Sequence, residues 1–395
     1  MSRISVMKPW LGPEEAEAVS RVIVTGRVGQ GPRTIEFERA FSAANAVSHG
    51  VATSSCTTAL HLALVVAGVQ AGDDVIVPSL SFIATANAVT YLGARPVFAD
   101  VDLVTGNVTA ETLDAVLTHG TTAVIAVDQG GMPLDLEPIR ELCDRHSLAL
   151  IEDAACGAGS TYRDRPVGTG ADVTAWSFHP HKLLTTGEGG MLTTDNPEWA
   201  ARARRLRDHS LDVSAAERHT SVLPVQERYP EVGYNYRMTD LQAAMGLVQL
   251  AKLPEMIRRR RALVDDYQAV LSTLPGLRYA VDPEHGNSNF QSFWVEVLPD
   301  FPLNREELLE WLATDGVGAR RGIMAAHRQG AYTGHSGLVR PLPMTERLSD
   351  NSLILPIFHT MTEEEHRRVT DSLRAAAESP RNTREHPTTR GGGRP

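Results

Sequence analysis

The sequence predicts an α/β protein: a mostly parallel sheet with helices on both faces, followed by a smaller α+β domain. Between about residue 46 and residue 250, short apolar segments alternate with segments of helical periodicity, which is typical of βαβ units. Two of the apolar segments, 148–151 and 173–176, are followed closely by ionisable side chains. Ligands of such sheets bind outside the carboxyl ends of the strands, so we expect the site there.

The individual elements follow from the same patterns. Strands are expected at 74–77, 96–99, 123–127, 148–151 and 173–176, and helices around 61–64 and at 84–92, 109–117 and 136–146. A long helix is expected from 238 to about 274, and after it strands at 293–297 and 353–355 and helices at 305–313 and 362–377. This divides the chain into a large domain (1–245), a small domain (246–377) and a polar tail (378–395) that we expect to be disordered.

Composition excludes several classes of protein. With 395 residues, 42% of them hydrophobic and 22% charged, the chain has the composition of a soluble globular protein of two domains. A net charge of −10 argues against a nucleic-acid-binding surface. Three cysteines without framework spacing indicate a reducing compartment. Neither a secretory leader nor a membrane span is apparent, so we expect a cytoplasmic protein.

The segment Ser177–Gly190, SFHPHKLLTTGEGG, holds the first candidate catalytic residue, Lys182. A lysine at the end of a buried strand, among small residues that let a ligand approach, suits a Schiff base with an aldehyde cofactor. Asp153 ends the preceding strand segment and can pair with the pyridinium nitrogen of pyridoxal phosphate (PLP). The alternative is a glycine-rich turn with an incidental lysine.

A phosphate site is expected where 54–58, SSCTT, leads into a helix. Small hydroxyl residues at a helix N-terminus offer free N–H groups and side-chain donors, which favours Thr57 and Thr58 as phosphate ligands; plain N-capping is the alternative. Ser177 is a second candidate ligand. Phe82 could stack on the pyridine ring or be an ordinary core aromatic.

Two further patterns have ordinary structural explanations and do not indicate a binding site. His179 and His181 have an H-x-H spacing, but no cysteine or carboxylate falls at a matching distance, so no metal site is expected. The run 258–261 consists of four arginines, with Asp265 and Asp266 following on the same predicted helix. We expect a solvated, ion-paired face there.

Several motifs together resemble the DegT/DnrJ/EryC1/StrS aminotransferases over about residues 5–375. They are KPWLGPEEAEAV, SSCTTALHLAL, VPSLSFIATANAV, GARPVFADVD, LIEDAACGAGS, SFHPHKLLTTGEGGML and GYNYRMTDLQAAMG. The resemblance implies a PLP enzyme of fold type I that acts on nucleotide-linked keto sugars or on keto-cyclitols.

The resemblance also implies residue roles. Lys182 matches the Schiff-base and proton-transferring lysine, and Asp153 the carboxylate on the ring nitrogen. Phosphate contacts correspond to Thr57, Thr58 and Ser177, and the stacking aromatic to Phe82. Asn235 matches an asparagine that reaches the phosphate of a neighbouring subunit, which implies a homodimer with shared sites.

Two positions depart from the family pattern. Many relatives carry glutamine at the position of Cys156, where it bonds the phenolic oxygen of the cofactor, and a thiol donates only weakly. His181 has no assignable family role. Relatives that have become dehydratases carry histidine in place of the lysine itself, so the presence of Lys182 favours transamination.

The expected reaction is therefore transfer of an amino group from glutamate or glutamine to a keto sugar that is linked to a nucleotide. A keto-cyclitol (inosose-type) substrate in an aminocyclitol pathway, or a non-catalytic regulatory relative, are the alternatives. A nucleotide diphosphate would need cations, and the candidates are Arg320, Arg321, Arg237 and Arg27. Each of these could equally be a surface charge.

Overall fold

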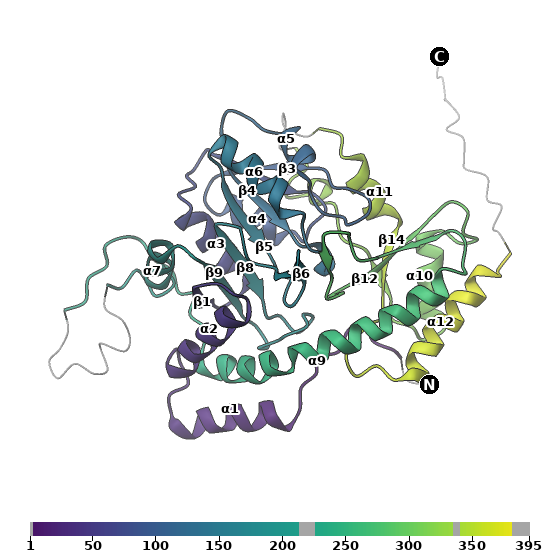
Figure 1. Cartoon of the computed structure of the whole chain (residues 1–395), viewed down its shortest axis with the longest axis horizontal. Coiled ribbons are helices and arrows are strands. Elements are labelled where there is room, and N and C mark those ends of the chain that lie inside the picture. The colour runs from purple at the N-terminus through teal and green to yellow at the C-terminus, as the bar shows by residue number, and fades with distance from the viewer. Residues whose placement is uncertain (1–2, 213–225, 335–339, 381–395) are drawn as a thin grey trace, which may run out of the picture.

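The computed structural model describes residues 3–212, 226–334 and 340–380, and its centre is a seven-stranded sheet (Figure 1). The strand order is β1-β9-β8-β5-β4-β2-β3, and only β9 runs against the other strands. The predicted mostly parallel sheet is thus confirmed.

The elements occupy the following residues. The sheet consists of β1 (His49–Thr53), β2 (Asp74–Pro78), β3 (Arg95–Ala99), β4 (Thr121–Val127), β5 (Ala149–Asp153), β8 (Val173–Ser177) and β9 (Gly190–Thr194). The helices before the long one are α1 (Pro13–Thr25), α2 (Pro32–Ala44), α3 (Cys56–Val66), α4 (Ala84–Thr90), α5 (Ala110–Asp114), α6 (Leu136–His146) and α7 (Pro197–Leu206).

Both faces of the sheet are buried, which explains why its strands are continuous apolar runs. Alternate residues point to opposite sides: Val75 and Ile151 belong to the apolar cluster that contains α3, whereas Ile76 and Leu150 belong to the cluster that contains α6. The sequence expectations for these elements hold to within a few residues. β9 was not expected, because it directly follows the glycine-rich segment without a turn signal of its own.

The second half of the chain forms a smaller antiparallel sheet in the order β10-β12-β14-β13. Its strands are β10 (Leu277–Tyr279), β12 (Phe293–Val297), β13 (Arg320–Arg321) and β14 (Ser352–Leu355), and its helices are α10 (Arg305–Thr314), α11 (Pro343–Asn351) and α12 (Glu363–Ala377). A third, three-stranded sheet pairs β11 (Gly286–Asn287), β6 (Thr161–Tyr162) and β7 (Arg165–Pro166).

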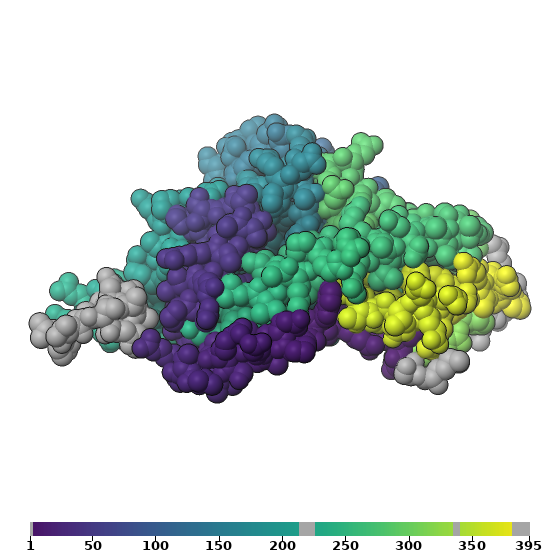
Figure 2. All heavy atoms as spheres, turned by 60° about the horizontal axis from the view of Figure 1, so that its bottom comes forward, coloured from purple at the N-terminus to yellow at the C-terminus, as the bar shows by residue number. Residues whose placement is uncertain are grey.

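The long helix α9 (Asp240–Leu271) connects the two halves (Figure 1). Figure 2 shows α1 lying along α9 on one face of the molecule, with α12 beside the other end of α9. One apolar cluster contains Ile76 and Leu150 of the large sheet together with Phe293 and Leu355 of the small one. The two sheets therefore share a core, and the division at residue 245 remains a prediction.

Three of the four arginines on α9 form ion pairs as expected, but the expectation of a solvated face was wrong for Arg260. Arg258 and Arg259 pair with Glu255, and Arg261 pairs with Asp282. Arg260 is fully buried and donates to backbone carbonyls instead. A run of four residues spans more than one turn of helix, so one of its members has to face the core.

Two buried carboxyl groups, Asp128 and Glu152, lie at the carboxyl ends of β4 and β5. Burial and the mutual charge of Glu152 raise the pKa of Asp128 well above its usual range, and burial raises the pKa of Glu152 to about 7. Thr174 donates to Glu152 (3.2 Å), and the Leu134 amide donates to Asp128 (3.1 Å). Burial and the proximity of like charges thus favour the protonated acid at both positions.

Within the described residues, no helix is both long and apolar enough to cross a membrane. The disorder expected for the tail concerns mainly residues 381–395, which lie outside the described residues.

Candidate active site

Lys182 lies on the loop that joins β8 to β9, at the carboxyl end of β8. The Phe178 amide donates to the Gly189 carbonyl (2.9 Å), and the Thr186 amide donates back to the Phe178 carbonyl (3.0 Å). The Lys182 amide donates to the His179 carbonyl (2.9 Å), which turns the chain at the lysine. Antiparallel pairing of β8 with β9 therefore forces a closed loop with Lys182 in it.

Lys182 differs from the other lysines of the chain. The sequence contains three, and Lys8 and Lys252 pair with Glu365 and Glu15 at 3.4 and 2.7 Å. Among the described residues, Lys182 has no carboxylate within ion-pair distance. Its amine donates to the sulfur of Cys156 (3.0 Å).

Asp153 is the last residue of β5, the strand adjacent to β8, and it is 4% exposed. Its carboxylate accepts a hydrogen bond from the Thr85 hydroxyl (2.9 Å) and one from the Ala155 amide (3.2 Å). The thiol of Cys56 lies 3.9 Å from the same group. Burial raises the pKa of Asp153, while the Thr85 hydroxyl, the Ala155 amide and the positive charge of Lys182 oppose that rise.

Asp153 and Lys182 are close enough to affect each other's ionisation. Burial alone would lower the pKa of Lys182, but Cys156, Cys56 and Asp153 act more strongly, and the pKa lies above its ordinary value. The structure thus brings the amine and the carboxylate to one edge of the sheet, as strand order predicts.

The N-terminus of α3 offers free donors for an anion. Ser55 caps the helix by accepting from the Thr58 amide (3.2 Å). The amides of Cys56 and Thr57 and the hydroxyl of Thr57 donate to no acceptor in the described part of the chain. The Thr58 hydroxyl is already used in the cap, because it donates to the Ser55 carbonyl (2.8 Å). The local geometry thus leaves Thr57 free for a phosphate and commits Thr58 to the helix end.

Phe82 is not a core residue, since 66% of its surface is exposed. It lies in the turn before α4, where its carbonyl accepts from the amide of Thr85 (3.2 Å), the residue that contacts Asp153. Ser177 ends β8 opposite Gly190 and is half-buried. An exposed ring three residues before the threonine that bonds Asp153 suits the face of a bound aromatic cofactor.

These groups fit PLP. A buried carboxylate for the ring nitrogen, an amine for the aldehyde, an exposed aromatic ring and free N–H groups for the phosphate all lie at the carboxyl ends of β1, β5 and β8 and in the adjacent turn before α4. When bound, the cofactor would be held by Lys182, Asp153 and Thr57.

Two neighbours of Asp153 were not expected from the sequence, Thr85 and Cys56. Thr85 lies 68 positions before Asp153, and only the packing of α4 against the sheet brings them together. The sequence carries a weak signal for Thr85, since Ser81 and Thr85 are spaced by one helical turn. In the structure their hydroxyl groups share a hydrogen bond (2.9 Å). Cys156, at the position where many relatives carry glutamine, contacts the amine of Lys182 in this structure.

The four candidate arginines lie in different surroundings. Arg237 is paired with Asp208, Arg321 donates to Glu306 (3.0 Å), and Arg27 is exposed on the loop after α1. Arg320 lies beside the lysine loop, because its charge contributes to lowering the pKa of His181 after burial and His179. Arg320 forms no ion pair with a described residue.

Asn235 is exposed and lies in a short backbone bridge with Asp208. The rings of Tyr234 and Tyr236 on either side are stacked at 4.9 Å. The exposed position of Asn235 does not test a role toward a second subunit, which remains a prediction.

The histidines of the lysine loop form a local contact. The His181 amide donates to the ring of His179 (3.1 Å), and the two rings lie edge to face at 5.0 Å. Residues 3–212, 226–334 and 340–380 contain no group of three or more histidines, cysteines or carboxylates placed to hold a metal ion.

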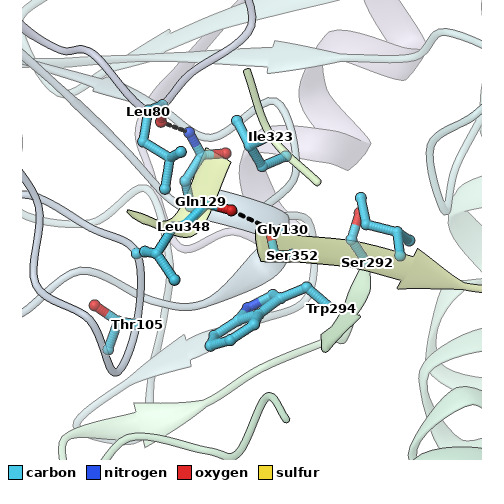
Figure 3. Close-up of a pocket in the computed structure, with 11 residues that line it drawn as sticks. Leu80, Thr105, Gln129, Gly130, Ser292, Trp294, Ile323, Leu348 and Ser352 are labelled. Atoms are coloured by element: carbon cyan, nitrogen blue, oxygen red, sulfur yellow. Dashed lines mark hydrogen bonds between the residues drawn. The ribbon is translucent and has the colours of Figure 1, made fainter. Parts of the chain in front are cut away.

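A cavity lies at the junction of the two sheets (Figure 3). Gln129 and Gly130, after β4, face Ser292 and Trp294 across it, and the Gln129 amide donates to the carbonyl of Leu80. Neither Lys182 nor Asp153 lines this cavity. It is therefore separate from the candidate cofactor site.

Solved structures similar to this chain include several aminotransferases. The chain is 37% identical to the aminotransferase TlmJ from Streptoalloteichus hindustanus, covering 94% of this chain and 98% of that one with a TM-score of 0.87. It is 32% identical to DesI, solved with its TDP-sugar product (95% and 93% covered, TM-score 0.87). It is 25% identical to Spr1654 from Streptococcus pneumoniae, solved in PLP and PMP forms (96% and 99% covered for the PMP form, TM-score 0.89).

The same assignment follows from a family comparison, in which the model of the DegT/DnrJ/EryC1/StrS aminotransferase family matches residues 9–374. The fold is that of the fold type I aminotransferases. The chain belongs to the DegT/DnrJ/EryC1/StrS family of PLP-dependent aminotransferases.

Proposed function

We propose that this enzyme transfers an amino group from glutamate or glutamine to a nucleotide-linked keto sugar in the cytoplasm. The observation that carries the proposal is the lysine amine beside a buried carboxylate, with free helix N–H groups at the same edge of the sheet. A keto-cyclitol of the inosose type is the second candidate substrate, since the described site does not distinguish a ring oxygen from a ring carbon.

Each residue has a defined task in this proposal. When bound, PLP supplies an electron-withdrawing ring that lets the carbon bearing the nitrogen exchange a proton. Lys182 holds the cofactor and afterwards carries that proton on Nζ. Asp153 keeps the ring nitrogen protonated, because a nearby negative charge favours the cationic form. The exposed ring of Phe82 would pack on the bound cofactor and limit its contact with water.

Replacing Lys182 tests the reaction class. We expect the purified protein to absorb visible light with PLP and to carry the cofactor on Lys182, out of three lysines, after borohydride reduction and peptide mass mapping. Lys182→Ala should lose roughly 10²–10⁴-fold or more in turnover, the usual value of a general acid–base group. Lys252→Ala is the matched control. A protein that stays colourless with added PLP would instead be the non-catalytic regulatory relative.

Asp153 and Thr85 make a second test. Asp153→Asn keeps the volume but loses the charge, and we expect turnover to fall on the order of 10²-fold. Thr85→Val removes one hydrogen bond to a charged group and should cost roughly tenfold, whereas Thr85→Ser keeps the hydroxyl and should stay near the wild type. Turnover is measured at saturating concentrations of both substrates. Full activity in Asp153→Asn would assign the electron-sink role to another group.

Arg320 is our candidate for the anionic part of a substrate. It lies beside the lysine loop without an ion-pair partner in the described chain, whereas Arg321 on the same strand is bound to Glu306. A nucleotide diphosphate and a donor carboxylate could each use this cation. The TDP-sugar product of DesI supports the nucleotide-linked substrate.

Substrate kinetics of Arg320→Met therefore separate the two uses. We expect the KM of one substrate to rise about tenfold, as for a lost charge-assisted hydrogen bond, and Arg321→Met to change little. The assay screens TDP- and UDP-linked keto sugars and inososes with glutamate and glutamine. Unchanged KM values for every accepted pair would remove Arg320 from the site.

We also propose a homodimer in which Asn235 completes the phosphate site of the other subunit. Its exposed side chain, next to the stacked Tyr234 and Tyr236, supports this arrangement. Lys182→Ala and Asn235→Ala subunits, mixed after mild dissociation, should form hybrids with one intact site and recover activity above either variant. Flat activity despite demonstrated hybrids and an impaired Asn235→Ala homodimer would contradict shared sites.

A further inference from the structure

A short segment between β11 and β12 holds the lysine loop from outside the large sheet. The side chain of Gln291 accepts a hydrogen bond from the Leu183 amide (2.8 Å) and donates one to the His181 carbonyl (2.6 Å). These two backbone groups flank Lys182. Gln291 is 7% exposed, and its bond to the Leu183 amide is buried.

A glutamine is suited to this position because its head group carries a donor and an acceptor in one plane. The orientation of the Gln291 side-chain amide is fixed by its partners, since the Leu183 N–H only donates and the His181 carbonyl only accepts. No other described group forms a hydrogen bond with the Leu183 N–H or the His181 carbonyl. Leu183 is buried, and a buried backbone N–H requires such a partner.

The same segment also holds the turn that follows Asp153. The side-chain amide of Asn289 donates to the carbonyls of Cys156 (2.7 Å) and Ala158 (2.9 Å). Its side-chain oxygen accepts from the backbone N–H of Gln291 (2.7 Å). Cys156 in turn contacts the lysine amine. Segment 289–291 is therefore bonded to both strand ends that carry the reacting groups.

Arg260 anchors this segment to α9. Its buried guanidinium donates to the carbonyls of Phe290 (2.7 Å) and Gln291 (2.8 Å) and of Ile357 (3.0 Å). Burial lowers the pKa of Arg260 to about 9, so the group is still charged at neutral pH. Hydrogen bonds from a buried cation are strong, which makes the anchor rigid.

We propose that Gln291 is a positioning residue for amino transfer, which fixes the backbone on both sides of Lys182 and so sets where its amine lies relative to Asp153. This inference rests on the proposed role of Lys182. Misplacing a reacting group by about 1 Å can cost roughly 10²-fold in rate, so a clamp on the adjacent backbone has a large effect on turnover.

The test compares Gln291→Met with Gln268→Met. Methionine keeps the length of the side chain and loses both hydrogen bonds. Gln268 on α9 donates to the Ala280 carbonyl (2.9 Å) instead, so its replacement controls for a lost amide bond in the small-domain half. For Gln291→Met we expect a fall in kcat of about tenfold or more with a smaller change in KM, and for Gln268→Met a kcat within twofold of the wild type.

A readout independent of turnover uses the apoenzyme. Trace acetylation with acetic anhydride, followed by mass spectrometry, reports the reactivity of each of the three lysines, with Lys8 and Lys252 as internal references. We expect Lys182 in Gln291→Met to be acetylated at least about threefold faster relative to both references, because the released loop frees the amine from Cys156. A general loss of structure would raise all three rates together.

Gln291→Glu provides a pH-dependent rescue. A carboxylate would face the His181 carbonyl without a proton to donate, whereas the protonated acid restores both bonds. The ratio of Gln291→Glu to wild-type kcat should therefore rise as the pH is lowered from 8.5 to 6, and the same ratio for Gln291→Met should stay flat. If the kcat ratios of the two variants changed with pH in the same way, the positioning role of Gln291 would be wrong.

Failure of this inference and failure of the proposed function are distinguishable. If wild-type enzyme carries reduced PLP on Lys182 but Gln291→Met matches it in kcat and acetylation pattern, only the positioning role is wrong. If wild-type Lys182 carries no cofactor, the proposed function itself falls.

Discussion

The close approach of β9 to the end of β1 is the constraint on which the site depends. Gly190 pairs with Thr53 of β1 on one side and with Ser177 of β8 on the other. A side chain at Gly190 would place its Cβ 2.4 Å from the backbone of Ser55, so only glycine lets the strands meet there. This pairing brings the helix N-terminus that suits a phosphate next to the loop that carries the lysine.

Of the three carboxyl groups at this edge of the large sheet, one remains available to pair with a cofactor. Asp128, Glu152 and Asp153 lie within two adjacent strand ends, and three unprotonated carboxylates there would repel one another. Burial raises the pKa of all three carboxyl groups. For Asp153, the Thr85 hydroxyl, the Ala155 amide and the amine of Lys182 oppose that rise and favour the ionised form.

The sequence predicted the parts of the site that follow from strand order. The sequence places Lys182 and Asp153 after two apolar runs, and in the structure these runs are the neighbouring strands β5 and β8. Thr85, Arg260 and Gln291 could not be found in this way, because each acts through a partner far away along the chain. The hydrogen bonds of Gln291 span 108 and 110 positions, and nothing local in its surroundings marks them.

The shared core explains why the lysine loop is held by residues from the other half of the chain. The loop buries the side chains of Phe178, Leu183 and Leu184, but the backbone on both sides of Lys182 is bonded to Gln291 of the other half. Part of its order therefore comes from neighbours that are themselves fixed. Arg260 is fixed by α9, which packs on α1 and α2 beside the large sheet and continues to the small one. The position of the reacting amine is thus a property of both sheets together.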